Sequence, residues 1–450
     1  MPYLAELARR LVRAETTSEA LIDRALANAL DPGGEGSRTF VKLYEDGARE
    51  AAISADRLRA RGVIPSPLAG IPISIKDLFD VRGEPTTAGS KVLIDATPAQ
   101  HDSTVIARLR AAGAIIVGRT NMTEFAFSGL GINPHYGTPR NPYDRSTGRI
   151  PGGSSSGAAV SVSDGMSEVG IGTDTGGSVR IPAALCGLVG FKPTARRISR
   201  DGVLPLSTTL DSIGPIARSV ACCALVDAIM AGESPDIPPA LPIAGLRLGV
   251  VRDYVCDGLE DAIATTFERA LAILSKAGAH IMEMPFPELA RLPALNRSGG
   301  FAGAEAYAWH RDLLRGRAAE YDPRVSVRIA AAQGLSAADY IALGGHRANM
   351  IARAKLVATP YDALLMPTTA MTAPSIATLE GDDDQYSRAN LAMLRNPSTI
   401  NFLDGCALSV PCHESGKAPV GLMIAGLTGD DRRVLQVGQA IEGALTVLAH

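Results

Sequence analysis

The sequence predicts an α/β protein built around one sheet, and three observations support this prediction. Amphipathic helix patterns alternate with short apolar, β-branched runs along most of the chain, which is how α/β folds are assembled. The Pro-rich segment 232–245 would suit a linker,. Apolar strand patterns nevertheless resume beyond it without a helical layer of their own size. We therefore expect one large domain over residues 1–450.

The N-terminal segment, residues 1–62, is expected to be mainly helical. The stretch "TTSEALIDRALANAL" opens with a capping-box pattern, Thr16 followed by Glu19, and continues with apolar residues at helical spacing,. A second amphipathic pattern ends at Gly62, a residue type that commonly follows a helix.

Strands and helices are expected to alternate over the next segment, about 63–225. The run "PISIK" is typical of a buried strand that ends in a charge at Lys76,. A helix capped by Asp102 or Ser103 then leads into the strand pattern "AIIVG",. The C-terminal part, about 240–450, contains "DALLMP", "ALSVP" and "VGLMIAG", which we expect to complete the same sheet.

Composition excludes several classes of protein. A net charge of −3 argues against a nucleic-acid partner,. Charges interrupt every apolar stretch before 18 residues, so we expect no membrane span and no export signal,. The six cysteines lack metal-ligand spacing and fit reduced thiols in a cytoplasmic protein,. The acidic run 380–385 lacks the pattern of a calcium loop and is expected to be a solvated loop,.

The serine-rich stretch 148–165 allows two interpretations. Its "GSSSG" matches the G-x-S-x-G elbow, which would make Ser155 the nucleophile of an α/β-hydrolase,. That elbow needs a preceding strand, and Pro151 followed by two glycines is a poor strand,. Alternatively, these glycines and serines only form turns and allow close packing of a helix on a sheet. Composition alone leaves both interpretations open.

A second Gly-Gly-Ser favours chemistry in this region. In "GTDTGGSVRIPA", Ser178 follows Gly176 and Gly177 and precedes an expected helix start. A strand, two glycines and a helix N-terminus aim backbone N–H groups at one point, where they can stabilise a developing oxyanion. A serine hydroxyl at that point is placed to attack a carbonyl carbon.

Lys76 is the candidate base for such a serine. The chain has only seven lysines, and this one ends an apolar strand. Lowering a lysine pKa from about 10.4 to roughly 7 disfavours the charged form by about 4.6 kcal/mol, which burial can achieve. The alternative is that Lys76 pairs with Asp77 or another carboxylate at a sheet edge.

These motifs together resemble the amidase-signature family of serine hydrolases. The resemblance is dense over "PLAGIPISIKDLFDVRGEPTTAGS", "PGGSSSGAAVSVSDG", "GTDTGGSVRIPAALCGLVGFKPT" and "GVLPLSTTLDSIGPIAR", and it thins between about 230 and 360. It implies the amidase-signature fold, a large central mixed sheet with helices on both faces. It also implies a Ser-Ser-Lys triad, with Ser178 as nucleophile, Ser154 as bridging serine and Lys76 as base. The family's cis peptide bond would join Gly153 to Ser154.

The resemblance assigns further residues around this triad. The implied oxyanion hole consists of the backbone N–H groups of Thr175, Gly176, Gly177 and Ser178. Three side chains are expected to orient the triad, namely Ser155, Asp174 and Arg180. The substrate pocket would be lined by Phe127, Ser128, Gly129 and Gly131. The small residues among them imply room for bulky or aromatic groups rather than a polar amino acid,. Asp164, where relatives have small residues, is expected to be exposed and inert.

The resemblance implies a serine hydrolase that cleaves non-peptide C–N bonds of amides, anilides or carbamates (urethanes), with esters open to the same chemistry. We expect a small-molecule substrate, a monomer or homodimer, and no metal or organic cofactor. The alternative is the glutaminase (A) subunit of a glutamyl-tRNA(Gln) amidotransferase complex. That role needs a charged pair for glutamine, which the sequence does not reveal. A catalytically inactive scaffold is disfavoured because all three triad positions are filled.

Overall fold

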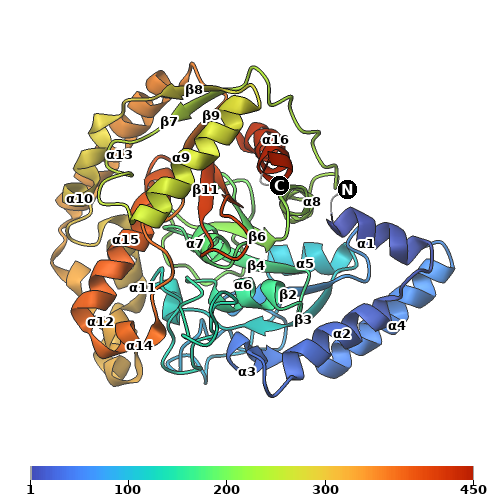
Figure 1. Cartoon of the computed structure of the whole chain (residues 1–450). Coiled ribbons are helices and arrows are strands. Elements are labelled where there is room, and N and C mark those ends of the chain that lie inside the picture. Colours follow the sequence, from blue (N-terminus) through green and yellow to red (C-terminus); the bar gives the residue numbers. More distant parts are fainter. Residues whose placement is uncertain (1–2, 449–450) are drawn as a thin grey trace.

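One mixed sheet runs through the computed structural model, which describes residues 3–448 (Figure 1). Its 11 strands lie in the order β1-β3-β2-β4-β6-β5-β10-β11-β9-β7-β8. They are β1 Phe40–Leu43, β2 Pro72–Lys76, β3 Ile115–Thr120, β4 Val169–Asp174, β5 Val189–Lys192, β6 Ser212–Ala217, β7 Arg247–Val250, β8 His280–Glu283, β9 Ala363–Pro367, β10 Cys406–Pro411 and β11 Gly421–Gly426. Strands from both sides of segment 232–245 therefore share one sheet, and the predicted α/β fold is confirmed.

Helices connect and cover these strands. The N-terminal part and the core contain α1 Tyr3–Val12, α2 Ser18–Leu30, α3 Gly36–Thr39, α4 Glu45–Ala60, α5 Thr104–Ala111, α6 Ser156–Ser163, α7 Arg180–Leu185 and α8 Val220–Ala231. The C-terminal part contains α9 Asp261–Lys276, α10 Leu292–Leu295, α11 Gly300–Arg317, α12 Pro323–Ala330, α13 Ala337–Ala358, α14 Ile376–Gly381, α15 Asp383–Phe402 and α16 Asp431–Leu448. In Figure 1, α1, α2 and α4 project together from one side of the molecule.

Both faces of the C-terminal part of the sheet are buried. Along β11, Leu422 and Ile424 belong to a core that includes residues of α9 and α16. The intervening Met423 and Ala425 belong to a second core, shared with α13 and α15. Because successive side chains of a strand point to opposite faces, helices cover this sheet on both sides.

The local sequence signals mostly agree with the structure, which decides one open alternative and differs at two points. Thr17, not Thr16, caps α2, and its side chain accepts the N–H of Ala20. Of the two candidates for the cap of α5, Ser103 is the one that accepts the N–H of Ile106. The acidic run 380–385 is a helix boundary and not a loop, because the Asp382 side chain accepts the N–H of Gln385 and starts α15.

The register of two parallel strands positions the candidate site. β2 pairs in parallel with β4, with Ile75 opposite Ile171. The carboxyl ends of these neighbours, Lys76 and Asp174, therefore lie at the same edge of the sheet. Helix α6 packs closely over them, because a Cβ on Gly170 would lie 2.6 Å from the Ala158 carbonyl oxygen. This contact brings the serine-rich segment that precedes α6 to the same edge.

Within residues 3–448, the search for a helix long and apolar enough to cross a lipid bilayer finds none.

Truncating a central side chain of this sheet should be costly for stability. Leu408 lies in β10 and is completely buried, so we expect Leu408→Ala to lower the free energy of unfolding by about 2–5 kcal/mol. Leu391 is 70% exposed on α15, and Leu391→Ala should change it by less than about 0.5 kcal/mol. Urea unfolding followed by circular dichroism measures both. Equal losses in the two variants would contradict the described core.

Candidate active site

Lys76 lies at the end of β2 and is completely buried. Its Nζ is 2.7 Å from Ser154 Oγ and 2.9 Å from Thr173 Oγ1. The amine is thus hydrogen bonded to two neutral hydroxyl groups, one from the serine-rich segment and one from β4. This is the environment that the apolar strand pattern predicted for it.

Burial lowers the pKa of Lys76 to about 7, although the nearby carboxylates of Asp211 and Asp174 oppose this shift. Removing water disfavours the charged form of an amine, and two hydroxyl dipoles replace only part of its hydration. Near neutral pH a large fraction of Lys76 is therefore an unprotonated amine that can accept a proton.

The alternative ion pair between Lys76 and Asp77 is not formed. The Asp77 carboxylate instead accepts a hydrogen bond from Arg119 Nε at 2.7 Å and the backbone N–H of Gly89 at 2.9 Å. Because successive residues point to opposite sides of an extended chain, Asp77 and Lys76 face different partners.

The serine-rich segment has an unusual backbone conformation where it contacts Lys76. The peptide bond between Gly153 and Ser154 is cis, as the family resemblance implied. The Ser154 carbonyl accepts the N–H of Thr123 at 3.1 Å, and Ser155 N–H donates to the Ser178 carbonyl at 3.3 Å. Among residues 3–448, no hydrogen bond joins the side-chain hydroxyls of Ser154 and Ser178. The structure therefore brings Lys76 into contact with Ser154 and places the two serine segments side by side, and the proton relay between them stays a prediction.

Ser155 does not occupy a nucleophile elbow. The residues before it form no strand, whereas that motif requires one. Its Oγ donates to the backbone carbonyl of Thr173 at 3.3 Å. Ser155 thus ties the start of α6 to β4, and its predicted role in orienting the triad stays a prediction.

Asp174 organises the turn that carries Ser178. Its carboxylate accepts the backbone N–H of Gly177 at 2.9 Å and that of Val179 at 3.2 Å. Gly177 has φ +127°, and a Cβ there would lie 2.6 Å from Pro397 Cβ. Only glycine fits this turn without strain.

A buried ion pair fixes the Asp174 carboxylate. Arg180 Nε and Nη2 donate to its two oxygens at 3.0 and 2.8 Å, and both side chains are completely buried. Asn401, from α15, accepts from Arg180 Nη2 at 2.6 Å and donates to Asp174 Oδ1 at 2.9 Å. Burial alone would raise the pKa of Asp174, but Arg180, followed by Lys192, holds it well below its usual range.

This network changes the expected oxyanion hole. The Gly177 N–H, predicted to be one of its donors, donates to Asp174 in this structure. A donor engaged by a carboxylate is not available to a substrate oxygen. The remaining predicted donors are the N–H groups of Thr175, Gly176 and Ser178.

The glycines of the predicted pocket segment serve close packing. A Cβ on Gly131 would lie 2.3 Å from the Gly152 carbonyl oxygen, and one on Gly129 would lie 3.2 Å from the side chains of Ile181 and Leu394. Gly129 and Gly131 therefore allow neighbouring segments of the chain to pack closely. They do not leave the open space that we expected from their small size. That this segment lines a substrate pocket stays a prediction.

Two side chains from the C-terminal part contact the same segment. Asn390 Oδ1 on α15 accepts the Ser128 hydroxyl and the Gly129 N–H, both at 2.9 Å. The guanidinium of Arg328, on α12, lies 5.3 Å from the centre of the Phe127 ring and donates to the Phe127 carbonyl. A cation thus lies beside the predicted pocket, which the sequence did not indicate.

Asp164 is not the exposed, inert residue that the sequence suggested. Its carboxylate accepts hydrogen bonds from Arg145 Nη1 and Nη2 at 2.7 and 2.9 Å, and its side chain is only 15% exposed. It ties the end of α6 to the loop before the serine-rich segment.

Sequence reasoning missed Thr173 and Asn401. Thr173 stands within "GTDTGGS", where its place one residue before the last of a strand that ends at the site was a usable signal. Asn401 lies more than 200 residues from Asp174, and no local pattern connects them. Among residues 3–448, a search for three or more metal-ligating side chains in one place finds no group.

Removing Arg180 should destabilise the protein strongly. Arg180→Met leaves the buried Asp174 carboxylate without its main cation, and we expect a loss of about 3–5 kcal/mol in the free energy of unfolding. Arg315, 76% exposed and paired with Asp312, is the matched control, and Arg315→Met should cost less than about 1 kcal/mol. Urea denaturation at pH 7.5 distinguishes them. Similar midpoints for both variants would refute the structural importance of the Asp174–Arg180 pair.

The sequence matches one protein family and is similar to individual known proteins over most of its length. The family model described as Amidase matches residues 34–435. The chain is 36% identical to 2-amino-5-chloromuconic acid deaminase of Comamonas testosteroni, over 98% of this chain and 96% of that protein. It is 35% identical to the A subunit of the glutamyl-tRNA(Gln) amidotransferase of Chloroflexus aggregans, over 96% of this chain and 94% of that protein.

Solved structures agree with these matches. A crystal structure of an amidase superposes with a TM-score of 0.88 and 33% identity, covering 98% of this chain and 99% of the other. Peptide amidase from Stenotrophomonas maltophilia superposes with a TM-score of 0.82 and 27% identity, covering 99% and 98%. The eleven-stranded sheet, the buried lysine beside the cis peptide bond and these matches agree, and the chain belongs to the amidase family.

Proposed function

We propose that this protein hydrolyses the C–N bond of small-molecule amides through an acyl-enzyme on Ser178. One observation carries the proposal. Lys76, whose pKa burial lowers to about 7, lies within hydrogen-bond distance of Ser154. A neutral amine in that place can act as a general base near neutral pH.

Acylation begins when Ser178 Oγ attacks the substrate carbonyl carbon. Ser178 gives its proton to Ser154, and Ser154 gives its own proton to the Lys76 amine. A C–O bond forms, the carbonyl π electrons move to the oxygen, and the backbone N–H groups of Thr175, Gly176 and Ser178 stabilise that oxyanion. The proton then returns through Ser154 to the leaving nitrogen as the C–N bond breaks. A water molecule hydrolyses the resulting ester by the same relay.

Thr173 supports this relay by orienting the amine. A neutral lysine has two N–H donors and one lone pair. When one N–H donates to Thr173 Oγ1 at 2.9 Å, the lone pair is free to point toward Ser154. Catalytic hydrogen bonds often tighten only when substrate is bound, so we expect the Ser154–Ser178 link to form in the Michaelis complex.

The proposed substrates are amides, anilides and carbamates, and esters share the same acyl-transfer chemistry. The family includes a relative named for the deamination of an amino-chloromuconic acid and a peptide amidase, so acyl groups of different size and charge occur within it. The Arg328 guanidinium beside Phe127 favours an acyl group that carries a polar or acidic substituent over a purely aromatic one.

The second candidate is the glutaminase component of an amidotransferase complex. It is supported by the similarity to the A subunit of glutamyl-tRNA(Gln) amidotransferase, and Arg328 supplies a cation that could face an α-carboxylate. Glutamine hydrolysis that appears only after partner subunits are added would favour this candidate. Turnover of simple amides by the isolated chain, as a monomer or homodimer, would favour the first.

Replacing the nucleophile tests the assignment directly. Ser178→Ala removes the attacking oxygen, so we expect hydrolysis of a panel of amide, nitroanilide, urethane and ester substrates to fall by about 10⁴-fold or more. Ser163→Ala, at the far end of α6, should retain wild-type turnover. Mass spectrometry should locate a fluorophosphonate adduct on Ser178 in the wild type. Equal turnover by wild type and Ser178→Ala would refute the proposal.

The pH dependence follows from the base. Because the relay needs neutral Lys76, kcat/KM should rise as the pH increases through about 7 and then reach an alkaline plateau,. Lys76→Met should lower the plateau by about 10²–10⁴-fold. The exposed Lys91 provides the control, and Lys91→Met should keep both the rate and the profile. A Lys76→Met variant with full activity at pH 7 would contradict this base.

A further inference from the structure

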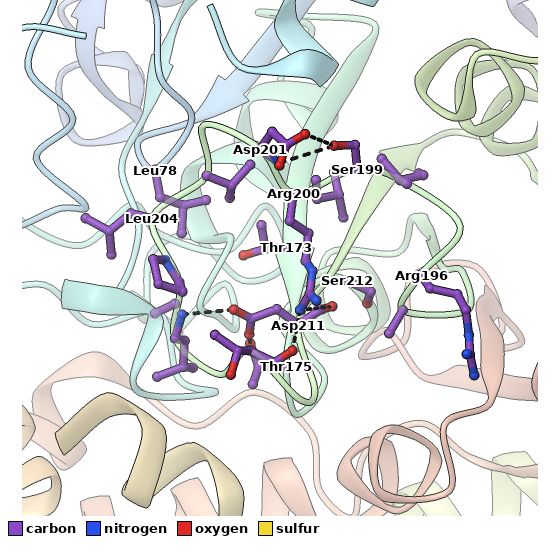
Figure 2. A pocket seen from close by; sticks show the side chains of 18 residues that line it. Leu78, Thr173, Thr175, Arg196, Ser199, Arg200, Asp201, Leu204, Asp211 and Ser212 are labelled. Atoms are coloured by element: carbon purple, nitrogen blue, oxygen red, sulfur yellow. Dashed lines mark hydrogen bonds between the residues drawn. The ribbon is translucent and has the colours of Figure 1, made fainter. Parts of the chain in front are cut away.

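A cavity of about 420 Å³ lies next to the lysine end of the site (Figure 2). Two of its lining residues lie at the carboxyl end of β4: Thr173, which is hydrogen bonded to Lys76, and Thr175, which directly follows the strand and is the first residue of the predicted oxyanion hole. The segment 195–213 forms most of the remaining wall. Asp211, directly before β6, lies in this wall and is the acidic side chain that reaches toward Thr175.

The Asp211 carboxylate accepts hydrogen bonds on both of its oxygens. Thr175 Oγ1 donates to Oδ1 at 2.5 Å, and the backbone N–H groups of Leu206 and Ser207 donate to Oδ2 at 2.9 and 3.0 Å. A carboxylate accepts hydrogen bonds on both oxygens, whereas an amide presents donors on one side. Asp211 therefore joins the 206–211 turn to Thr175.

The turn itself is held from two sides. Arg200 Nη1 donates to the backbone carbonyls of Thr208 and Asp211 at 2.8 and 3.3 Å. Glu305, on α11, accepts the N–H of Thr209 at 3.0 Å. Asp211 consequently has a fixed position relative to β4, and Figure 2 shows the Arg200 side chain extending toward it.

The charged groups around Lys76 differ in how far they are neutralised. Asp174 is paired with Arg180 and lies near Lys192, and Asp77 is paired with Arg119. Asp211 is held by hydroxyl and backbone donors, and Arg200 is the cation that acts on it. Of the two carboxylates that act on Lys76, the effect of Asp211 is the larger, which agrees with its weaker neutralisation.

We propose that Asp211 is a positioning residue of the relay: it anchors Thr175 at the oxyanion hole, and its negative charge, on the cavity wall that it shares with Thr173, opposes the loss of the Lys76 proton. The proposal rests on the proposed function of the same site. Burial raises the pKa of Asp211 to about 6, and the hydrogen bonds from Thr175, Ser207 and Leu206 partly oppose this shift. At pH 7 and above, where Lys76 loses its proton, Asp211 is therefore mostly ionised.

The proposal predicts the direction in which the pH profile moves when the charge of Asp211 is removed. A carboxylate near an amine favours the ammonium form, so Asp211 keeps Lys76 protonated to a higher pH than burial alone would. Removing its charge should move the onset of activity to lower pH. A residue that only supports the fold would lower the rate without moving this onset.

The test measures the second-order rate at which a fluorophosphonate probe labels Ser178 between pH 5.5 and 9.5, which needs no knowledge of the substrate. For Asp211→Asn we expect the rising limb to shift downward by roughly 0.5–1 pH unit. We also expect the plateau to fall by about tenfold, since the amide NH₂ that replaces Oδ1 cannot accept the Thr175 hydroxyl,. Asp201→Asn removes a charge from the same cavity wall, where Asp201 contacts Ser199, and should leave limb and plateau within error of wild type.

A second variant keeps the test decisive if Asp211→Asn fails to fold. Arg200→Met retains the carboxylate and removes the cation that acts on it, so the limb should move upward. The role of Asp211 would be overturned if the rising part of the pH profile stayed in place in Asp211→Asn or in Arg200→Met. It would also be overturned if Asp201→Asn shifted that profile as much as Asp211→Asn does. A wild type that is not labelled at Ser178 at any pH would instead refute the proposed function, on which this role depends.

Discussion

The structure depends on one unusual contact, an amine placed out of water between two hydroxyl groups. Lys76 is completely buried, and its hydrogen bonds go to Ser154 and Thr173. A charged amine in this position would lack a directly paired carboxylate, so the low pKa is the physical consequence. The rest of the site is arranged so that this amine faces the hydroxyl of Ser154.

A second buried group keeps that arrangement rigid. Asp174 is ionised, and its charge is balanced by Arg180 and Lys192. Through Gly177 and Val179 it shapes the turn before α7, and through Asn401 it connects that turn to α15. The two carboxylates near Lys76 thus have different tasks: Asp174 builds the turn, and Asp211 is proposed to anchor Thr175 and to tune the base.

The sequence predicted the local parts of this site better than the tertiary ones. The strand ending in Lys76 and the strand-glycine-helix turn at Ser178 follow from residue patterns within about a dozen positions. The ion pair of Asp164, the occupied N–H of Gly177 and the close packing at Gly131 arise from chain segments that meet only in the fold. Glycine allows both open space and close approach, so its presence could not decide between them. The family resemblance, and not residue spacing alone, supplied the link between Lys76 and Ser154.

The protonation state of Lys76 is the central claim and can be measured without turnover. In protein labelled with ε-¹³C lysine, the seven lysines give resonances whose chemical shifts report their charge, and the signal lost in Lys76→Met identifies this residue. The account predicts that this resonance titrates near pH 7. A Lys76 resonance that stays in the ammonium position up to about pH 10, as for an exposed lysine, would contradict it.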